Sequence, residues 1–281
     1  MILLAFWAGF FAQPLRAEVE RDLEYGSIDG TALKLNLFKP QGKQAGLLVY
    51  IHGGAWRAGA KEDCPILELV QAGYAVASVD YRLTPQAPFP ANVHDIKGAI
   101  RFLRAEGPRL GIEADHMAII GSSAGGHLAA LVGVSDGVPE LEGSVGGHAG
   151  VSSRVHAIVS FFGASNLETI LGQSTEYGLS VREPALRLLL GGSPLEKPAL
   201  ARLASPVAHL DPKDPPILLI HGDADPQMPL QQSEELERAC AVRGVQARLY
   251  VLPGARHGGA EFYDATRMQL VRAFLEKHLG R

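Results

Sequence analysis

Three side chains in this sequence have the types and surroundings that nucleophilic catalysis requires. Ser123 lies between two glycines in Gly121-Ser122-Ser123-Ala124-Gly125, His257 lies in the glycine-containing segment 254–259, and Asp225 follows an apolar run. A serine hydroxyl attacks well near neutral pH only when a base takes its proton. Imidazole is suited to that task, and a carboxylate fixes the imidazole tautomer. The sequence therefore predicts Ser123 as nucleophile, His257 as base and Asp225 as the acid that orients it.

The position of Ser123 follows from the pattern on either side of it. Four apolar residues, 117–120, precede the small residues, and the helix-prone segment 127–131 follows them. This order predicts a strand, a sharp turn and a helix, with the serine exposed at the turn. The register Gly121-x-Ser123-x-Gly125 favours Ser123 over Ser122. A tight turn of small residues with no chemistry is the alternative reading.

Two aspartates compete for the role of the acid. Both follow the apolar run 216–220, in His221-Gly222-Asp223-Ala224-Asp225-Pro226. We expect Asp223 to close the turn by bonding local N–H groups. The pre-proline restriction holds Asp225 extended, so that its carboxylate can reach the loop of His257. His221, Asp223 and Asp225 could imitate a metal site, but no H-E-x-x-H motif or further clustered ligand accompanies them, so we predict no metal and no cofactor.

A second glycine-containing loop follows another apolar run. Residues 47–51 are continuously apolar, as in a central strand buried on both faces, and His52-Gly53-Gly54-Ala55-Trp56 comes next. Glycines here leave main-chain N–H groups unobstructed, which is what stabilising an oxyanion requires. A plain glycine-rich connection is the alternative. We expect Trp56 to contribute an aromatic wall to the substrate pocket.

Strand and helix patterns alternate along the chain and predict an α/β fold with a mostly parallel sheet covered by helices on both faces. In such a sheet the ligand site lies beyond the carboxyl ends of the strands, where all the motifs above fall. Residues 163–207 contain no strand pattern and form a cap-like insertion before the penultimate strand. The expected strands are two within 22–39, then 47–51, 74–79, 117–120, 155–162, 216–220 and 247–252; the expected helices are 62–72, 90–106, 183–190, 230–243 and one ending at 278.

Composition narrows the class of protein. The 281 residues carry 26 basic and 30 acidic side chains, a net charge of −4, with no basic block that would suggest a nucleic-acid partner. The length and the apolar content of 47% allow one large domain, residues 18–281. Cys64 and Cys240 are the only cysteines, and we expect two unpaired thiols because a chain of this length needs no disulfide.

The first residues have the character of a targeting segment. Residues 2–12 are apolar but too short to span a bilayer, and Pro14-Leu15-Arg16-Ala17 follows them. We predict a signal peptide, 1–17, and hence an exported protein with no stable membrane insertion after cleavage. The run lacks a preceding basic residue, so a membrane anchor and a first core element stay open as alternatives.

With these residues identified, the sequence after residue 20 resembles the α/β-hydrolase superfamily of serine esterases. His52-Gly53-Gly54-Ala55-Trp56 resembles the oxyanion loop of the hormone-sensitive-lipase-like and kynurenine-formamidase-like groups. Gly121 to Ala129 and His221 to Pro229 resemble segments of the bacterial group related to feruloyl and acetylxylan esterases, with Met228 in place of a usual valine. The resemblance implies oxyanion donors from Gly54, Ala55 and Ala124, where Ala55 replaces the third glycine of the lipase-like relatives.

The resemblance implies a carboxylic-ester hydrolase that forms an acyl-Ser123 intermediate. Its expected substrates are small-molecule or carbohydrate-linked esters, including feruloyl esters, with short acyl groups because no long apolar helix is available as a lid. The alternatives are an amide hydrolase of the same fold, either a formamidase or a peptidase, and a non-catalytic binding protein. Retention of Ser123, Asp225 and His257 together argues against the binding protein.

Overall fold

A single twisted sheet organises the chain. The computed structural model describes residues 17–279, and within them eight strands lie in the order β1-β2-β4-β3-β5-β6-β7-β8. The β1–β2 and β2–β4 pairs are antiparallel, and the other neighbouring pairs are parallel. The predicted α/β class is therefore confirmed. The strands are β1 (Ala17–Ile28), β2 (Thr31–Pro40), β3 (Gly46–Ile51), β4 (Tyr74–Val79), β5 (Met117–Ser122), β6 (Ala157–Phe161), β7 (Ile217–Gly222) and β8 (Ala247–Leu252).

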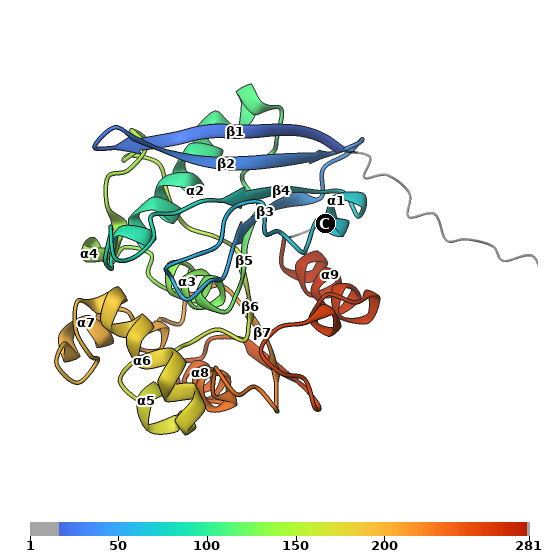
Figure 1. Ribbon diagram of the computed structural model, residues 1–281. Helices are drawn as coiled ribbons and strands as arrows, with labels where there is room; N and C mark the ends of the chain where they lie inside the picture. The colour runs from blue at the N-terminus through green and yellow to red at the C-terminus, as the bar shows by residue number, and fades with distance from the viewer. Residues whose placement is uncertain (1–16, 280–281) are drawn as a thin grey trace, which may run out of the picture.

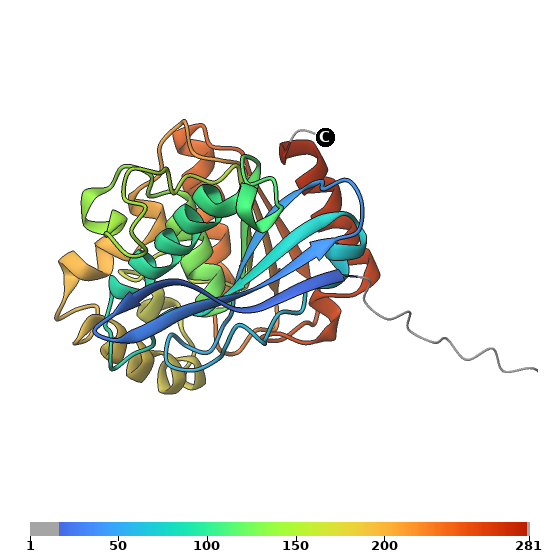
Figure 2. The ribbon, with the colours of Figure 1, turned by 90° about the horizontal axis from the view of Figure 1, so that it is seen from above.

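Helices cover both faces of this sheet (Figure 1). The apolar sides of α1 and α9 share one core with the sheet, and those of α2, α3 and α8 share the other. Figure 2, from above, shows α9 in red on one side of the strands and the teal and green helices on the other. The helices are α1 (Glu68–Gln71), α2 (Ala91–Leu110), α3 (Ala124–Gly133), α4 (Pro139–Glu142), α5 (Ile170–Gln173), α6 (Glu176–Leu190), α7 (Pro198–Leu203), α8 (Leu230–Arg243) and α9 (Ala265–Leu279), with short 3₁₀ turns η1 (Pro206–Ala208) and η2 (Ala260–Phe262).

The central strands are buried because each of their faces meets a different core. In β3, Leu47, Val49 and Ile51 pack with α2 and α3, while Leu48 and Tyr50 pack toward α1 and α9. Alternate side chains of a strand point to opposite faces, so a strand between two helical layers must be apolar throughout. The continuous apolar runs in the sequence thus predict the middle of the sheet well.

Three predicted helices differ from those observed. The helix expected over 62–72 is reduced to α1, because Pro65 disfavours a helical residue before it and Lys61 is tied to Asp80 by its backbone and its side chain. Helix α2 continues past residue 106 to Leu110, and Gly111 follows it as a left-handed C-cap. Helix α6 begins seven residues before the predicted 183, capped by Thr175, and contains Pro184 in its interior.

The insertion 163–207 lies between β6 and β7, before the penultimate strand as predicted, and contributes α5, α6 and α7, which gather beside α8 (Figure 1). Cys64 and Cys240 are both free thiols, as predicted. The predicted signal peptide covers residues 1–17, and all of these except Ala17 lie outside the described residues. Export therefore stays a prediction. None of the helices described here is long and apolar enough to cross a membrane.

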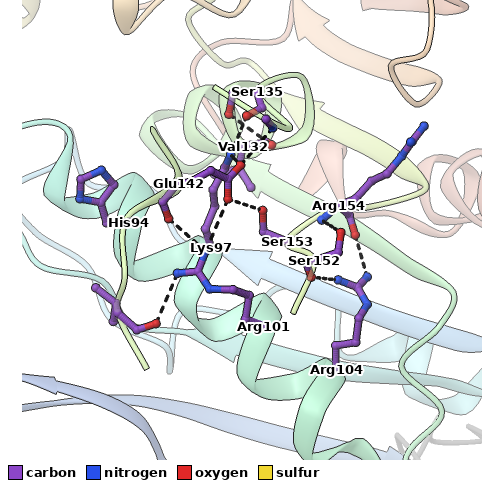
Figure 3. Close-up of polar contacts among 12 residues, drawn as sticks. His94, Lys97, Arg101, Arg104, Val132, Ser135, Glu142, Ser152, Ser153 and Arg154 are labelled. Atoms are coloured by element: carbon purple, nitrogen blue, oxygen red, sulfur yellow. Dashed lines mark hydrogen bonds and ion pairs between the residues drawn. The ribbon is translucent and has the colours of Figure 1, made fainter. Parts of the chain in front are cut away.

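Buried cations on α2 anchor the segment after α3 (Figure 3). The Lys97 ammonium donates to the Ser135 carbonyl at 2.7 Å and to Glu142 Oε1 at 2.6 Å, and Arg101 Nη1 donates to the Glu142 carbonyl at 3.0 Å. Ser153 Oγ donates to the other carboxylate oxygen of Glu142 at 3.0 Å. Lys97 and Arg101 are almost wholly buried, so the single carboxylate of Glu142 compensates two desolvated charges.

His127, in the first turns of α3, joins three parts of the chain. Its Nδ1 accepts the indole N–H of Trp56 at 3.1 Å, and its Nε2 donates to the carbonyl of Ala204, in the insertion, at 2.7 Å. The ring is fully buried, and this burial lowers the pKa of His127 to about 4. A neutral imidazole with its proton on Nε2 satisfies both contacts.

Glu142→Gln removes the charge that compensates Lys97 and Arg101, and we expect it to lower the free energy of unfolding by about 3 kcal/mol. Urea denaturation at pH 7 measures the change. Glu140→Gln, on the same short helix but exposed, is the control and should change the stability by no more than ~0.5 kcal/mol. Equal effects of the two substitutions would contradict this account of the network.

His127 makes stability depend on pH, because the folded protein holds this group neutral while the unfolded chain protonates it near pH 6.5. Its contribution is complete above pH 6.5 and is lost as the pH falls toward 4, by up to about 3 kcal/mol. His127→Gln keeps an acceptor and a donor but has no proton to bind. The gap in unfolding free energy between wild type and variant should therefore narrow between pH 7 and pH 4, measured by urea denaturation; a gap independent of pH would refute this assignment.

Candidate active site

Ser123 lies in the turn between β5 and α3, in a strained backbone conformation. Its φ and ψ angles are 55° and −119°, a region that non-glycine residues seldom adopt, and its N–H donates to the Phe161 carbonyl at 2.9 Å. The glycines on either side of Ser123 are required because backbone atoms of other residues approach them closely. A Cβ at Gly121 would lie 2.1 Å from the Gly125 oxygen, and one at Gly125 would lie 2.0 Å from the Ile51 oxygen. The predicted strand, sharp turn and helix are present here.

The structure brings the three predicted side chains together. Ser123 Oγ lies 2.8 Å from His257 Nε2, and His257 Nδ1 lies 2.6 Å from Asp225 Oδ2. Since a carboxylate only accepts hydrogen bonds, Nδ1 carries the proton and Nε2 is left to accept from the serine hydroxyl. The neighbouring Ser122 is turned elsewhere, with its hydroxyl 2.8 Å from that of Tyr50. The arrangement can pass the serine proton to imidazole.

The Asp225 carboxylate is completely buried but well supplied with donors. Its Oδ1 accepts the N–H groups of Gln227 and Met228, both at 2.8 Å, and His221 Nε2 lies 3.4 Å from Oδ2. Burial acts to raise the pKa of Asp225, but the hydrogen bonds from His221 and His257 outweigh it and hold the pKa well below its usual range. The carboxylate is therefore charged at neutral pH.

Asp223 and Asp225 make different contacts from those predicted. The local N–H groups of the turn go to Asp225, whereas Asp223 Oδ1 accepts from the N–H of Gly254 at 2.6 Å. Asp223 thus connects its own loop to the loop that carries His257. A carboxylate has two oxygens, so Asp225 can close its turn with one and hold the imidazole with the other.

The loop after β3 lies against the serine. A Cβ at Gly53 would lie 3.3 Å from that of Ser123, and Ala55 adopts a φ of 53°, the left-handed region that glycine favours. The alanine thus keeps the backbone shape expected of the third glycine. Among the described residues, the N–H groups of Gly54, Ala55 and Ala124 donate to no carbonyl or side chain, which leaves them available to an incoming oxygen. His52 braces the loop, stacked on Tyr81 with its Nδ1 2.8 Å from the Gly53 carbonyl oxygen.

Trp56 does not lie on a pocket wall, and that prediction is wrong. Its side chain is 0% exposed, packed in the core with its indole edge against His127. The indole N–H needs a buried acceptor, and His127 supplies it inside the protein. Trp56 therefore supports the loop of Ala55 from the side of the core.

Three residues around the site make contacts that the sequence did not predict. Phe162 directly follows β6 with a φ of 41° and packs edge-on against His257, their ring centroids 4.9 Å apart. His221 is fully buried and bonds the Met228 carbonyl and Ser233 Oγ. Arg182, on α6, donates to the carbonyl of Gln227. Burial lowers its pKa to about 10, against the opposing attraction of Asp225, so the guanidinium is charged near neutral pH. Only Phe162 and His221 had a signal, their positions at strand ends.

No group of three His, Cys, Asp or Glu residues in the described chain is placed to hold a metal ion. His221, Asp223 and Asp225, the set that could imitate such a site, are engaged with Met228, Gly254 and His257 instead. These contacts account for all three side chains within the protein.

Known proteins are similar to this chain in sequence and in fold. LipC, an esterase of Mycobacterium tuberculosis, is 32% identical over 220 residues, which are 77% of this chain and 53% of LipC, so the chain spans about half of that relative's length. Ethyl acetate hydrolase of Pseudomonas putida is 30% identical, over 84% of this chain and 74% of its own. The solved structure of a truncated carbohydrate esterase from gut microbiota superimposes with a TM-score of 0.85 at 29% identity, covering 96% of this chain and 99% of the other.

Most of the chain matches one known protein family. The BD-FAE model matches residues 34–240, which include β3 and its glycine loop, the turn of Ser123 and the segment of Asp225. The eight-stranded order and the resemblance of the motifs agree with the same assignment. The chain thus belongs to the BD-FAE family, with the fold of the α/β-hydrolase esterases.

Proposed function

We propose that this protein is a serine carboxylic-ester hydrolase. The observation that carries the proposal is the continuous hydrogen-bonded path from Ser123 through His257 to a buried, charged Asp225. Related proteins whose names state an activity are esterases, which favours esters over the amide substrates of a formamidase or peptidase. A binding protein would not require a proton acceptor 2.8 Å from a half-buried serine hydroxyl.

The reaction follows from the positions of these groups. His257 Nε2 takes the proton of Ser123 as its oxygen bonds to the ester carbon, and the carbonyl oxygen becomes an oxyanion. The N–H groups of Gly54, Ala55 and Ala124 stabilise that charge. When the carbon–oxygen bond breaks, His257 returns the proton to the departing alcohol. Water, deprotonated by His257, then cleaves the acyl-serine, releases the acid and restores the serine.

Asp225 keeps the base in working form throughout. With Oδ2 accepting from Nδ1, only the tautomer with a free Nε2 lone pair is favoured, and the negative charge stabilises the imidazolium formed during attack. The cost of burying this charge is offset by the N–H groups of Gln227 and Met228. The acid is therefore fixed before substrate arrives.

The serine assignment is tested with 4-nitrophenyl acetate, butyrate and dodecanoate. We expect wild type to turn over the two short esters with a higher kcat/KM than the dodecanoate, because the one long helix of the insertion, α6, carries Glu176, Glu183 and Arg187 and is not an apolar lid. Ser123→Ala should abolish hydrolysis of all three without unfolding the protein, since it removes only the nucleophile. Ser122→Ala, whose hydroxyl contacts Tyr50, is the control and should keep most of the activity. Loss in Ser122→Ala with an active Ser123→Ala would overturn the assignment.

The acid assignment is tested by comparing two aspartates. Asp225→Asn keeps the shape but stabilises the wrong imidazole tautomer, and we expect a loss in kcat of up to about 10⁴-fold. Asp223→Asn keeps an oxygen to accept from Gly254 and should cost about tenfold or less. Both kcat values are measured with 4-nitrophenyl acetate on protein whose circular dichroism matches wild type. A larger loss in Asp223→Asn would show that the acid has been misassigned.

A further inference from the structure

Helix α6 of the insertion buries a cation on its apolar side. The buried positions of this helix recur at helical spacing and hold small or apolar residues, with Arg182 as the exception. Arg182 is 4% exposed, whereas Arg187, on another side of the same helix, is exposed and pairs with Glu183 and Glu196. Arginine is rarely buried to this extent unless a partner compensates its charge.

The charge of Arg182 is poorly compensated by its direct contacts. Its Nη2 donates to the Gln227 carbonyl, its buried Nε has no hydrogen-bond partner, and it forms no ion pair with a carboxylate of the described chain. Burial lowers the pKa of Arg182 to about 10, which leaves the guanidinium charged near neutral pH. Such costly buried charges are concentrated at functional sites. The carboxylate that attracts this charge is that of Asp225.

One peptide group lies between the two charges. The C=O of Gln227 accepts from Arg182, and the N–H of Met228, in the same peptide group, donates to Asp225 Oδ1 at 2.8 Å. The C=O and N–H of a trans peptide point in opposite directions, so the guanidinium faces the negative end of the peptide dipole and the carboxylate faces the positive end. Both charges polarise the peptide in the same sense, which strengthens the two hydrogen bonds. Arg182 therefore acts on Asp225 through this peptide as well as across space.

The cation affects how readily His257 takes up a proton. Asp225 Oδ2 accepts from His257 Nδ1 at 2.6 Å, so the negative charge favours the imidazolium. A positive charge near the other carboxylate oxygen offsets part of this attraction and repels a second cation on the imidazole. Arg182 should thus keep Nε2 free to accept the Ser123 proton at a pH where the base would otherwise be protonated.

The other groups around this pair that can carry charge stay in place in a variant of Arg182. His221 lies 3.4 Å from Asp225 Oδ2, and Asp223 accepts from the N–H of Gly254. The remaining titratable groups on the neighbouring elements are exposed or half-buried: Glu176, Glu183 and Arg187 on α6, and Arg256, Glu261 and Tyr263 after β8. A change in the pH range of activity in such a variant is therefore due to the lost guanidinium.

We propose that Arg182 is a positioning residue that acts on Asp225 through the Gln227–Met228 peptide and extends hydrolysis toward lower pH. The inference rests on the proposed esterase function and adds to it a residue of the insertion that sets the pH range of the base. A residue with a packing role alone would change activity equally at every pH, because it would not alter the charge near the base.

The test measures kcat/KM for 4-nitrophenyl acetate from about pH 4.5 to about pH 8.5, because the acid limb of this profile reports the ionisation of the base in the free enzyme. Arg182→Met removes the charge, and we expect its acid limb to move to higher pH by about one unit. Below the limb this is a loss of about tenfold in kcat/KM, whereas above it the loss should be no more than about threefold. Arg182→Gln keeps an amide donor for the Gln227 carbonyl but no charge, and its limb should move in the same direction.

Two further variants separate charge from packing. Arg182→Lys keeps a cation at this position, and its acid limb should stay within about 0.3 pH unit of wild type. Arg187→Met, on the exposed side of the same helix, is the matched control and should leave the whole profile unchanged. Circular dichroism at each pH shows which variants are folded. If Arg182→Lys is the one folded variant at this position, the charge serves stability and the inference fails.

NMR titration of isotopically labelled imidazole gives a readout independent of turnover, with the His257 signal assigned by its loss in His257→Gln. In Arg182→Met the ring should gain its second proton about one pH unit higher than in wild type. Unmoved titrations and acid limbs in Arg182→Met and Arg182→Gln, with the ester still cleaved, would overturn the inference and leave the esterase standing. If wild type cleaves no ester, the proposed function fails. In that event, a shifted titration would still support the action of Arg182 on the pair, and equal titrations would refute it.

Discussion

The hydrogen bond between His257 and the buried carboxylate of Asp225 is the contact on which the other features of the site depend. A desolvated carboxylate is stable only when donors surround it, and here they come from separate parts of the chain. Two N–H groups belong to its own turn, His221 belongs to β7, and His257 belongs to the loop after β8. The parallel pairing of β7 with β8 brings these two loops together at one edge, so the register of the sheet fixes the geometry of the acid and base.

Strain is concentrated where the sheet presents chemistry. Ser123, Ala55, Trp56 and Phe162 all have positive φ angles, and they follow the neighbouring strands β5, β3 and β6. Such conformations cost on the order of 1–3 kcal/mol each and persist only where the surroundings determine them. Strands buried on both faces provide that rigidity, and the glycines at 121 and 125 allow the close approach of backbone that the turn requires. The rigid core therefore allows the strained loops to persist.

The sequence predicts the core better than it predicts the contacts made by polar side chains. Apolar runs such as 47–51 and 216–220 lead to strands because burial on two faces leaves no other composition possible, and glycines mark the loops that approach one another. The helices of the insertion are harder to predict from the sequence. Helix α6 continues through Pro184 because its packing outweighs the low helix propensity of proline. Trp56 was misplaced since its exposure depends on a partner, His127, 71 residues away. Arg182 had no local signal at all, because only the fold brings it beside Gln227.

Three hydrogen bonds hold the insertion to α3, to the loop before α2 and to the loop after β7, which bears on how a substrate would be selected. The Ala204 carbonyl accepts from His127, the Leu189 carbonyl accepts from the N–H of Phe89, and Arg182 donates to the carbonyl of Gln227. These contacts are buried or nearly so, and breaking any one of them would leave a polar group without a partner. An insertion held this way acts as a fixed wall rather than a cover that opens. For the proposed esterase, a fixed wall of this kind would select the substrate by the groups that it presents and not by closing over it.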